Sequence, residues 1–412
     1  MTHNDKRTRR LALLALVATV VGCSDVLTLD VEAPGRIADG DLNNLQAVPG
    51  LVSGMSFDFS QAFDGALQEV LLAGGDLWHS GSYDFGTFPR GILLQEPEDW
   101  DGGYGSMQQA RWVAEDGLRR ISEFLDPAAF DRNPDVARAY LIAGFANRLL
   151  GEVQCSSTID GGPEVSNVEH FNRADSLFSR AITVGGNAGR DDIVQAAYGG
   201  RASIRAWLGN WPAAVADAQQ VPEDFVWTAV FSTVSGAQDN DLVFETNNRK
   251  EFTVFNTMWD QITDDPRVPW EVVFDNANQV EVGQDGETDF FRQLKFLTRD
   301  DDIPLTKGTE MLVLRAEAAL RNQDIPGMVA LLDQARAEYG MDPIAPVPAD
   351  EAEAWELLRH ERAATVWLEG RRLFDLRRWK EEGGVRADPF AADRDTCFPI
   401  SREEQRVNPN FN

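Results

Sequence analysis

The stretch from Trp355 to Trp379, WELLRHERAATVWLEGRRLFDLRRW, constrains the fold more than any other part of this sequence. It opens as a helix, because one set of residues recurs at offsets of three and four and therefore shares a face. That face consists of Ala354, Leu357, Leu358, Glu361, Ala364, Thr365 and Leu368. Glu361 interrupts an otherwise apolar stripe, and a buried carboxylate costs several kcal/mol unless a cation and hydrogen bonds satisfy it. We therefore expect Glu361 to lie in a buried ion pair.

Arginines that could form such pairs are abundant in the same stretch. The candidate partners of Glu361, Glu369 and Asp375 are Arg362, Arg371, Arg372, Arg377 and Arg378. Gly370 is expected to end the helix and let the chain turn, because glycine readily adopts the left-handed conformation. Charged clusters also occur at active sites, but a helix hairpin locked by structural ion pairs is the favoured interpretation.

The composition indicates a folded protein with a strong acidic bias. Of the 412 residues, 43% are hydrophobic, and they include 11 Trp and 23 Phe. This length allows one large domain or two average ones. The 67 acidic residues exceed the 38 Lys and Arg residues and give a net charge of −29. Such a charge argues against a nucleic-acid backbone or an anionic membrane surface as the main partner.

Residues 1–22 are interpreted as a signal peptide. Its positive residues are Lys6, Arg7, Arg9 and Arg10. The apolar run from Leu11 to Val21 is too short to cross a bilayer, which needs about 20 residues. The residues that then resemble a bacterial lipobox are Val20, Val21, Gly22 and Cys23. This interpretation predicts cleavage before Cys23 and a lipid anchor on it, whereas an ordinary secretory signal with a chance cysteine is the alternative.

The two other cysteines, Cys155 and Cys397, would lie in an oxidising compartment. A disulfide between them is possible, but their separation in space decides it, and the sequence leaves the question open. The sequence contains neither a C-x-x-C pair nor a Cys/His cluster, so a structural zinc site is not expected.

Helical periodicity dominates the rest of the chain. The expected helices lie at about 42–73, with a break near 49–54, and at 106–125, 135–151, 168–184, 191–208, from 212 onward and at 325–338. The stretch AAYGGRASIRAWLGNWPAAVADAQQV resembles a tetratricopeptide repeat, and AEAALRNQDIPGMVALLDQARAEYG is a degenerate echo of it. The long interruption between them excludes a regular array. The predicted fold class is mainly α, a tetratricopeptide-like helical repeat scaffold with loop-rich, minor β excursions.

Two aromatic segments, 74–105 and about 221–300, interrupt the helical pattern. The second contains two expected strands, DLVFE at 241–245 and WEVVFD at 270–275. Loops with so many rings either bury them or offer them to a ligand. The rings predicted as ligand contacts are Trp78, Tyr83, Trp100, Trp259 and Trp270. Ordinary core packing is the alternative for each of them.

The C-terminal stretch resembles the signature of the SusD/RagB family of nutrient-uptake lipoproteins. Its matching residues are Glu361, Arg362, Glu369, Gly370, Arg372, Phe374, Asp375, Leu376, Arg377, Arg378 and Trp379. Thr365 and Val366 depart from the acidic and leucine positions of the family, so one usual ion pair is missing. Further matches are Asp302, Ile303, Pro304, Leu305, Glu310, Pro399, Ile400, Glu404, Asn408, Pro409 and Asn410, whereas Ser401 replaces a proline. The resemblance implies a single SusD-like domain over residues 23–412.

The sequence lacks the motifs of common catalytic and metal sites. His360 and Glu361 begin a zincin-like motif, but position 364 is alanine where the second histidine is required. No nucleophile elbow, phosphate-binding loop or dinucleotide fingerprint occurs in its required context. The acidic runs at 239–241 and 300–302 could hold calcium, yet neither has the twelve-residue loop pattern, and solvated turns are favoured. We therefore expect no enzymatic activity, no cofactor and no metal.

The resemblance implies a lipid-anchored, surface-facing protein of the bacterial outer membrane. Such a protein binds a nutrient, such as an oligosaccharide, and delivers it to a SusC-like TonB-dependent transporter. Aromatic rings stack on the apolar faces of sugars while polar side chains hold the hydroxyl groups, so the two aromatic segments suit a glycan. A peptide or another oligomer is an alternative ligand. The alternative functions are a glycan hydrolase and a repeat scaffold for envelope assembly.

Overall fold

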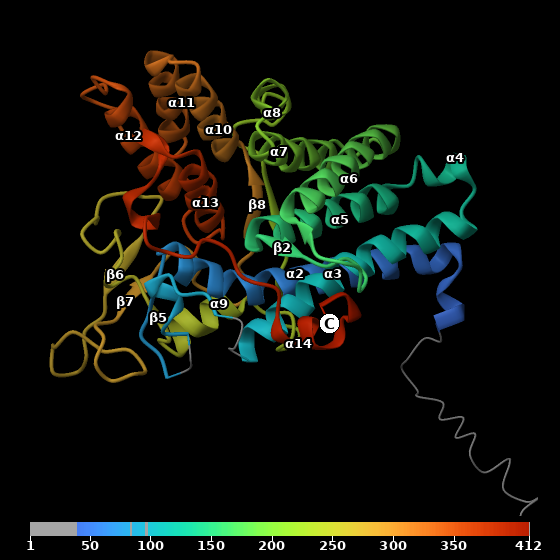
Figure 1. The fold of residues 1–412 in the computed structure, drawn as a ribbon, viewed down its shortest axis with the longest axis horizontal. Coiled ribbons are helices and arrows are strands. Elements are labelled where there is room, and N and C mark those ends of the chain that lie inside the picture. Colours follow the sequence, from blue (N-terminus) through green and yellow to red (C-terminus); the bar gives the residue numbers. More distant parts are fainter. Residues whose placement is uncertain (1–38, 83–84, 95–97, 412) are drawn as a thin grey trace, which may run out of the picture. The chain divides into compact units, whose positions relative to one another are not determined.

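The computed structural model of this protein describes residues 39–82, 85–94 and 98–411. Two units are distinguished along the chain, Met1–Leu42 and Asn43–Asn412. The described part of the first unit is a single 3-10 turn, η1 (Asp39–Leu42). The signal peptide expected at 1–22 and the lipid attachment expected at Cys23 lie outside the described residues. The second unit contains the elements labelled in Figure 1.

Helices form most of the second unit (Figure 1). They are α2 (Val48–Gly74), α3 (Glu98–Phe124), α4 (Pro127–Phe130), α5 (Pro134–Val153), α6 (Asn167–Ala188), α7 (Asp191–Trp207), α8 (Trp211–Ala218), α9 (Asp241–Val243), α10 (Gly308–Arg321), α11 (Ile325–Ala337), α12 (Glu351–Thr365), α13 (Arg372–Glu382) and α14 (Arg402–Val407). The predicted mainly α fold class is confirmed. Within the described part of the chain, no helix is both long and apolar enough to cross a membrane.

Two helix boundaries differ from the prediction. The break expected near 49–54 is absent from α2, because Pro49 lies in the first turn, where a missing amide hydrogen costs nothing. Helix α3 begins at Glu98 and therefore includes the last part of the segment that was predicted as a loop. Packing of α2 against α3 favours an uninterrupted helix in each case.

The strands of the described chain are short and form two-stranded antiparallel pairs. The pairs are β1 (Trp78–His79) with β5 (Phe252–Thr253), β2 (Ser156–Ser157) with β3 (Val165–Ser166), β4 (Val226–Ala229) with β8 (Ile303–Lys307), and β6 (Trp270–Val272) with β7 (Phe291–Gln293). Strand β6 confirms the first half of the strand predicted at 270–275. These pairs are too small to stand alone and rest on the helical scaffold.

The strand predicted at 241–245 is wrong, because these residues form α9 and a π-helical turn, η4 (Phe244–Asn248). The side chain of Asn240 accepts a hydrogen bond from the amide of Val243 at 3.1 Å. The carboxylate of Asp64 on α2 accepts one from the amide of Asp241 at 2.8 Å. These acceptors satisfy the free amides of a helix start, which local sequence could not reveal.

The repeat-like helices pack in chain order, α5 on α6, α6 on α7 and α7 on α8, and α10 packs on α11 and α12. Gly144 of α5 and Gly200 of α7 both lie against the ring of Phe178 on α6. A Cβ atom at either glycine would lie only 2.6 or 2.5 Å from that ring. Small residues therefore allow the close approach of these helices that the repeat-like pattern predicts.

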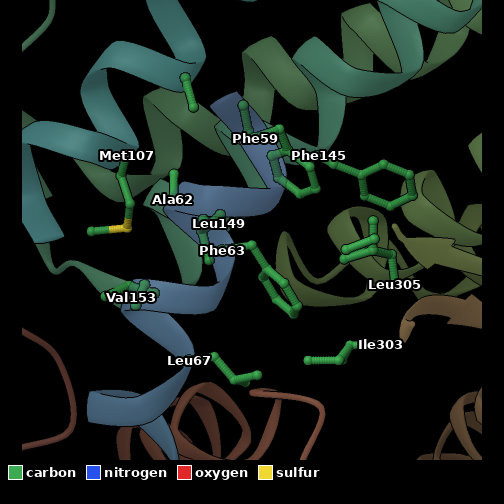
Figure 2. Packing of buried hydrophobic residues seen from close by; sticks show 14 of the residues in the cluster. Phe59, Ala62, Phe63, Leu67, Met107, Phe145, Leu149, Val153, Ile303 and Leu305 are labelled. Atoms are coloured by element: carbon green, nitrogen blue, oxygen red, sulfur yellow. The ribbon is translucent and has the colours of Figure 1, made fainter. Parts of the chain in front are cut away.

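The main hydrophobic core lies between α2, α3, α5 and β8 (Figure 2). Side chains from four separate parts of the chain meet there. Those labelled in Figure 2 are Phe59, Ala62, Phe63, Leu67, Met107, Phe145, Leu149, Val153, Ile303 and Leu305. The ring centroids of Phe59 and Phe145 lie 6.2 Å apart, so the first half of α2 is fixed against α5.

The Trp355–Trp379 stretch forms α12 and α13, which are separated by a turn in which Gly370 has a φ of +70°. Glu361 is 2% exposed, as predicted for a buried ion pair. Its partners are Arg267 and Arg336, at 2.5 and 2.7 Å. The prediction that Glu361 pairs with an arginine of its own stretch is therefore wrong. Arg267 comes from the segment predicted to face the ligand. Glu361 therefore ties that segment and α11 to α12.

Of the other two carboxylates of the stretch, Glu369 has partners that were not predicted, and Asp375 has partners that were. Glu369 binds Lys295 and Lys307, at 2.7 and 2.5 Å, rather than an arginine. Burial lowers the pKa of Lys295 to about 8, although Glu369 opposes this effect. Asp375 binds Arg362 and Arg378, each at 2.8 Å, and confirms two of the predicted partners.

Two glutamates of α10, Glu310 and Glu317, complete this network, which we call the C-terminal clamp. Glu317 binds Arg378 at 2.6 Å, and Glu310 lies 3.0 Å from Arg362. Burial by itself would raise the pKa of both carboxyls, but the surrounding arginines lower each pKa to about 2. The buried carboxylates of the clamp are thus each paired with a cation, as a structural network requires, although Nη1 of Arg362 has no hydrogen-bond partner among the described residues.

The last segment of the chain is fastened to the loop between α5 and α6. Cys155 and Cys397 form a disulfide with their Cα atoms 5.5 Å apart, which answers the question that the sequence left open. The side-chain amide of Asn408 also donates a hydrogen bond to the carbonyl of Gly162 at 2.9 Å. The C-terminus therefore belongs to the scaffold.

Candidate ligand-binding site

The predicted ligand-contacting rings are spread over several environments. Trp78 is half-buried in β1, immediately after α2, and its backbone lies opposite Thr253 of β5. Trp270 is half-buried in β6, and its ring stacks in parallel on Phe291 with the centroids 5.1 Å apart. Its indole N–H donates to the carbonyl of Ile262 at 2.8 Å. The orientation of the Trp270 ring is therefore fixed by its neighbours.

Of the remaining three predicted rings, one is fully buried, and the structure does not describe the side chains of the other two. Trp259 is fully buried, and its ring centroid lies 5.7 Å from that of His360. A ring in this position fills the core and has no face exposed to a ligand. Tyr83 lies outside the described residues. Trp100 is part of α3, but the structure describes only its backbone.

A cleft of about 410 Å³ lies between the first half of α2, helix α5 and the chain from β4 to Gln238, and we call it the α2–α5 cleft. Its α2 residues lie between 53 and 61, whereas Trp78 follows the other end of that helix. A helix rises 1.5 Å per residue, so Phe57 and Gly74 are about 26 Å apart. The cleft is therefore a separate region from the predicted rings at Trp78.

Aromatic side chains form the walls of the cleft. Phe59 and Phe145 lie at its base and also belong to the core shown in Figure 2. Phe57 and Trp227 are partly exposed, and Phe231 comes from the chain that follows β4. The segment predicted at about 221–300 does contribute to a cavity, but through rings other than those selected from the sequence.

A β-bulge shapes the strand that borders the cleft. Trp227 and Thr228 of β4 are opposite Thr306 and Pro304 of β8, so Leu305 is an extra residue between them. A bulge bends its strand and redirects a side chain, and Leu305 lines the cleft. The carboxylate of Asp302 accepts a hydrogen bond from the amide of Phe231 at 2.9 Å and thereby fixes the following chain.

Several polar groups of the cleft have no partner among the described residues. The side chains of Gln61, Gln238 and Arg138 form no hydrogen bond or ion pair there, and the indole N–H of Trp227 forms no hydrogen bond. Buried or half-buried polar groups are normally satisfied inside a folded protein. Groups that stay unpaired at a concave, largely aromatic surface are available to a ligand.

The acidic runs considered for calcium have structural roles. Asp301 accepts hydrogen bonds from the amide and hydroxyl of Thr298, at 3.0 and 2.8 Å, and thus stabilises a turn. Asp239 pairs with Arg299, and the side-chain amide of Asn240 donates a hydrogen bond to the carbonyl of Asp301 at 2.8 Å. Throughout the described chain, no group of three or more His, Cys, Asp or Glu side chains is placed to hold a metal ion.

Sequence reasoning missed the scaffold half of the cleft. Phe57, Gln61 and Arg138 lie on long helices whose apolar periodicity drew attention to their buried faces. Trp227 was visible as one aromatic residue among many in its segment. A usable signal was Phe57, because an aromatic residue off the buried stripe of a helix has no packing role to explain it.

Comparison with known proteins finds a family match in one part of the chain and a shared fold over most of it. A model described as the SusD family matches residues 292–410. The fold is also similar to that of a SusD homolog from Bacteroides thetaiotaomicron, with a TM-score of 0.69, 14% identity and coverage of 90% of this chain and 97% of the homolog. The chain thus carries a match to the SusD family over residues 292–410 and shares the fold of solved SusD-like structures.

Other SusD-family structures extend the comparison. A SusD superfamily protein from Bacteroides fragilis gives a TM-score of 0.68 at 13% identity, with 89% of this chain and 98% of that chain covered. A SusD-like carbohydrate binding protein from Bacteroides vulgatus gives 0.61 at 14% identity, with 81% and 83% covered. No curated protein sequence matches the chain. Identities this low establish a shared fold.

The SusD-family match and the cleft occupy different parts of the chain. The match at 292–410 contains the α12–α13 stretch and both glutamates of α10 in the clamp. Of the residues that line the cleft, it contains only Leu305. The family match therefore covers the clamp, and most of the cleft lies outside it.

Proposed function

We propose that this SusD-family protein is a lipid-anchored protein of the bacterial outer membrane that binds an oligosaccharide in the α2–α5 cleft. It then delivers the oligosaccharide to a SusC-like TonB-dependent transporter. The observation that carries the proposal is the cleft of about 410 Å³, whose aromatic walls surround polar groups without internal partners. Sugars combine apolar ring faces with many hydroxyl groups, and this combination suits such a surface.

The volume of the cleft and the structural neighbours of the protein support the proposal. Ligand pockets commonly have volumes of about 300–1,000 Å³, and the cleft lies in this range. One structural neighbour from Bacteroides vulgatus is described as a SusD-like carbohydrate binding protein. The proposed anchor is Cys23, which would hold the protein at the membrane surface. A lipid there would keep the cleft close to a transporter in the same membrane.

Binding without cleavage is proposed for this cleft. Glycoside hydrolysis commonly uses two carboxyl groups, one on each side of the scissile bond. No Asp or Glu is among the described residues that line the cleft. The cleft therefore offers rings and neutral donors rather than the acid and base of a hydrolase. Trp78, Tyr83, Trp100 and Trp270 stay predicted ligand contacts, and none of them is among the described residues that line the cleft.

Titration calorimetry of the purified protein with a panel of neutral and acidic oligosaccharides tests the proposal. We expect Trp227→Ala to weaken binding at least 10-fold, since stacking on one ring is worth about 0.5–1.5 kcal/mol beyond the apolar area it buries. Trp112→Ala is the matched control, because Trp112 is 52% exposed on α3 and does not line the cleft. Equal losses in both variants, or no binding of any oligosaccharide by the folded wild type, would contradict the proposal.

A further inference from the structure

The charge around the α2–α5 cleft differs from that of the whole chain. The protein has 67 acidic residues and a net charge of −29. Among the described residues that line the cleft, none is Asp or Glu, and Arg138 is the one charged side chain. Asp58 and Asp302 do not line the cleft, although the Asp302 carboxylate accepts hydrogen bonds from Thr228 and Phe231, which do. Arg138 is thus the charged group that the described lining offers to a ligand.

Arg138 lies on α5 with its side chain half-buried beside aromatic walls. Its guanidinium forms no ion pair or hydrogen bond within the part of the chain that the structure describes. Asp135 lies one turn earlier on the same helix and makes no ion pair with it either. A guanidinium that lines a cleft without an internal anion is available to pair with the anion of a ligand.

The guanidinium favours one class of anion. Its fixed fork of N–H donors matches the two oxygens of a carboxylate or a sulfate, and such charge-assisted bonds are roughly twice as strong as neutral ones. The Trp227 ring and the amides of Gln61 and Gln238 border the same space. Rings suit the face of a sugar and isolated amides suit its hydroxyl groups, whereas an extended peptide commonly pairs its backbone with a strand edge.

We propose that the α2–α5 cleft selects an acidic oligosaccharide, whose carboxylate or sulfate group pairs with Arg138 while a sugar ring stacks on Trp227. This inference rests on the proposed function and adds the class of its ligand. The acidic surface elsewhere opposes the approach of an anion only weakly, because salt screens charges beyond about 8 Å at physiological ionic strength. The unpaired guanidinium is the one charged group among the described residues that line the cleft.

The test is titration calorimetry with matched charged and neutral probes. Short oligosaccharides of galacturonic and mannuronic acid are compared with their methyl esters, and sulfated galactose oligosaccharides are compared with their desulfated forms. The variants are Arg138→Gln, Arg138→Lys and Arg132→Gln. Arg132 is exposed just before α5 and does not line the cleft, so its replacement makes the same change in net charge outside the site. Thermal unfolding of each variant verifies that it is folded.

We expect the wild type to bind an acidic probe at least 10-fold more tightly than its neutral counterpart. Arg138→Gln should weaken that binding about 10- to 100-fold, which is the usual worth of a hydrogen-bonded charge, while Arg138→Lys weakens it less and Arg132→Gln leaves it unchanged. A preference for carboxylated over sulfated probes, or the reverse, identifies the anion.

Three outcomes would overturn the inference. Equal binding of charged and neutral oligosaccharides that is insensitive to Arg138→Gln removes the acid selectivity and leaves the proposed function standing. Binding of an Asp- and Glu-rich peptide that depends on Arg138, without binding of any saccharide, overturns both the ligand class and the proposed function. Failure of the folded protein to bind any saccharide or peptide also overturns both.

Discussion

The C-terminal clamp and the α2–α5 cleft use arginine in opposite ways. In the clamp, Arg362 and Arg378 are fully enclosed, and each binds carboxylates from two different residues. In the cleft, Arg138 is half-buried and has no anion among the described residues. A buried charge whose partners are all internal is satisfied by the fold, whereas one whose partner is missing is available for a ligand. The contrast separates structural charges from functional ones more clearly than their number does.

The largest expected effect is the loss of a clamp carboxylate. Asp375→Ala leaves both Arg362 and Arg378 without one of their partners, and breaking a buried pair in this way costs about 3–5 kcal/mol. Glu361→Ala should have a similar effect, because Arg267 and Arg336 lose their shared partner. Denaturant-induced unfolding measures these losses in the free energy of unfolding.

The control for the clamp variants is Asp131→Ala. Its ion pair with Arg180 lies at the surface, with side chains 48% and 42% exposed, so a much smaller loss is expected. Oligosaccharide affinity should be retained in whatever clamp variant still folds. The comparison between the regions breaks down if the clamp variants unfold like the wild type, or if they remain fully folded and lose only binding.

A smaller effect, dependent on pH, is expected at Asp64, which joins α2 to the start of α9. Burial raises the pKa of its carboxyl from 3.8 to about 7. A raised pKa in the folded state contributes stability below pH 3.8, and this contribution is lost as the pH rises through 7. Asp64→Asn cannot ionise, so its free energy of unfolding relative to the wild type should increase by roughly a few kcal/mol between about pH 4 and pH 8.

Unfolding of Asp64→Asn and of the wild type is compared by urea denaturation at about pH 4, 6 and 8. The substituted asparagine still offers a carbonyl oxygen to the amide of Asp241, so the hydrogen bond at 2.8 Å can persist. A stability difference that is constant with pH would show that Asp64 is ionised in the folded protein over the whole range. In that case Asp64 would behave like the clamp carboxylates, and the distinction between paired and unpaired buried acids would need revision.

The smallest effect is expected in the cleft. Gln61→Ala removes a side chain that has no hydrogen-bond partner within the described protein, so the free energy of unfolding should change by less than about 0.5 kcal/mol. Oligosaccharide affinity should fall about 2- to 10-fold, which corresponds to one neutral hydrogen bond. Calorimetry and thermal unfolding on the same sample measure both. A loss of stability without a loss of affinity would assign Gln61 to the fold instead.

The sequence predicted the features that depend on local periodicity. The helical scaffold, the turn at Gly370 and the burial of Glu361 all follow from patterns that lie within a few turns of each other. The partners of Glu361 could not be predicted from local periodicity, because Arg267 is 94 residues away and only the fold brings it near. The DLVFE strand failed for the same reason, since the carboxylate of Asp64 stabilises the first turn of a helix there.

The cleft was still harder to predict. Its residues come from α2, from α5 and from the chain after β4, and each set looks ordinary in its own context. Trp259 and Trp270 were selected for their aromatic character, yet one fills the core and the other is held by Phe291 and Ile262. Aromatic composition identified a segment that contributes to the cleft but could not identify the rings, because exposure is decided by long-range packing.

The link between Lys307 and Glu369 has a consequence for how the protein matures. Lys307 ends β8, and β8 is the strand that supports the wall of the cleft through β4. In a chain synthesised from its N-terminus, α2 and α5 are therefore made long before residue 369, which pairs with Lys307. Chains truncated before α12 would carry every described residue that lines the cleft but would lack Glu369, the partner of Lys307. Only a chain that extends past Glu369 has the ion pair that holds β8 behind the cleft.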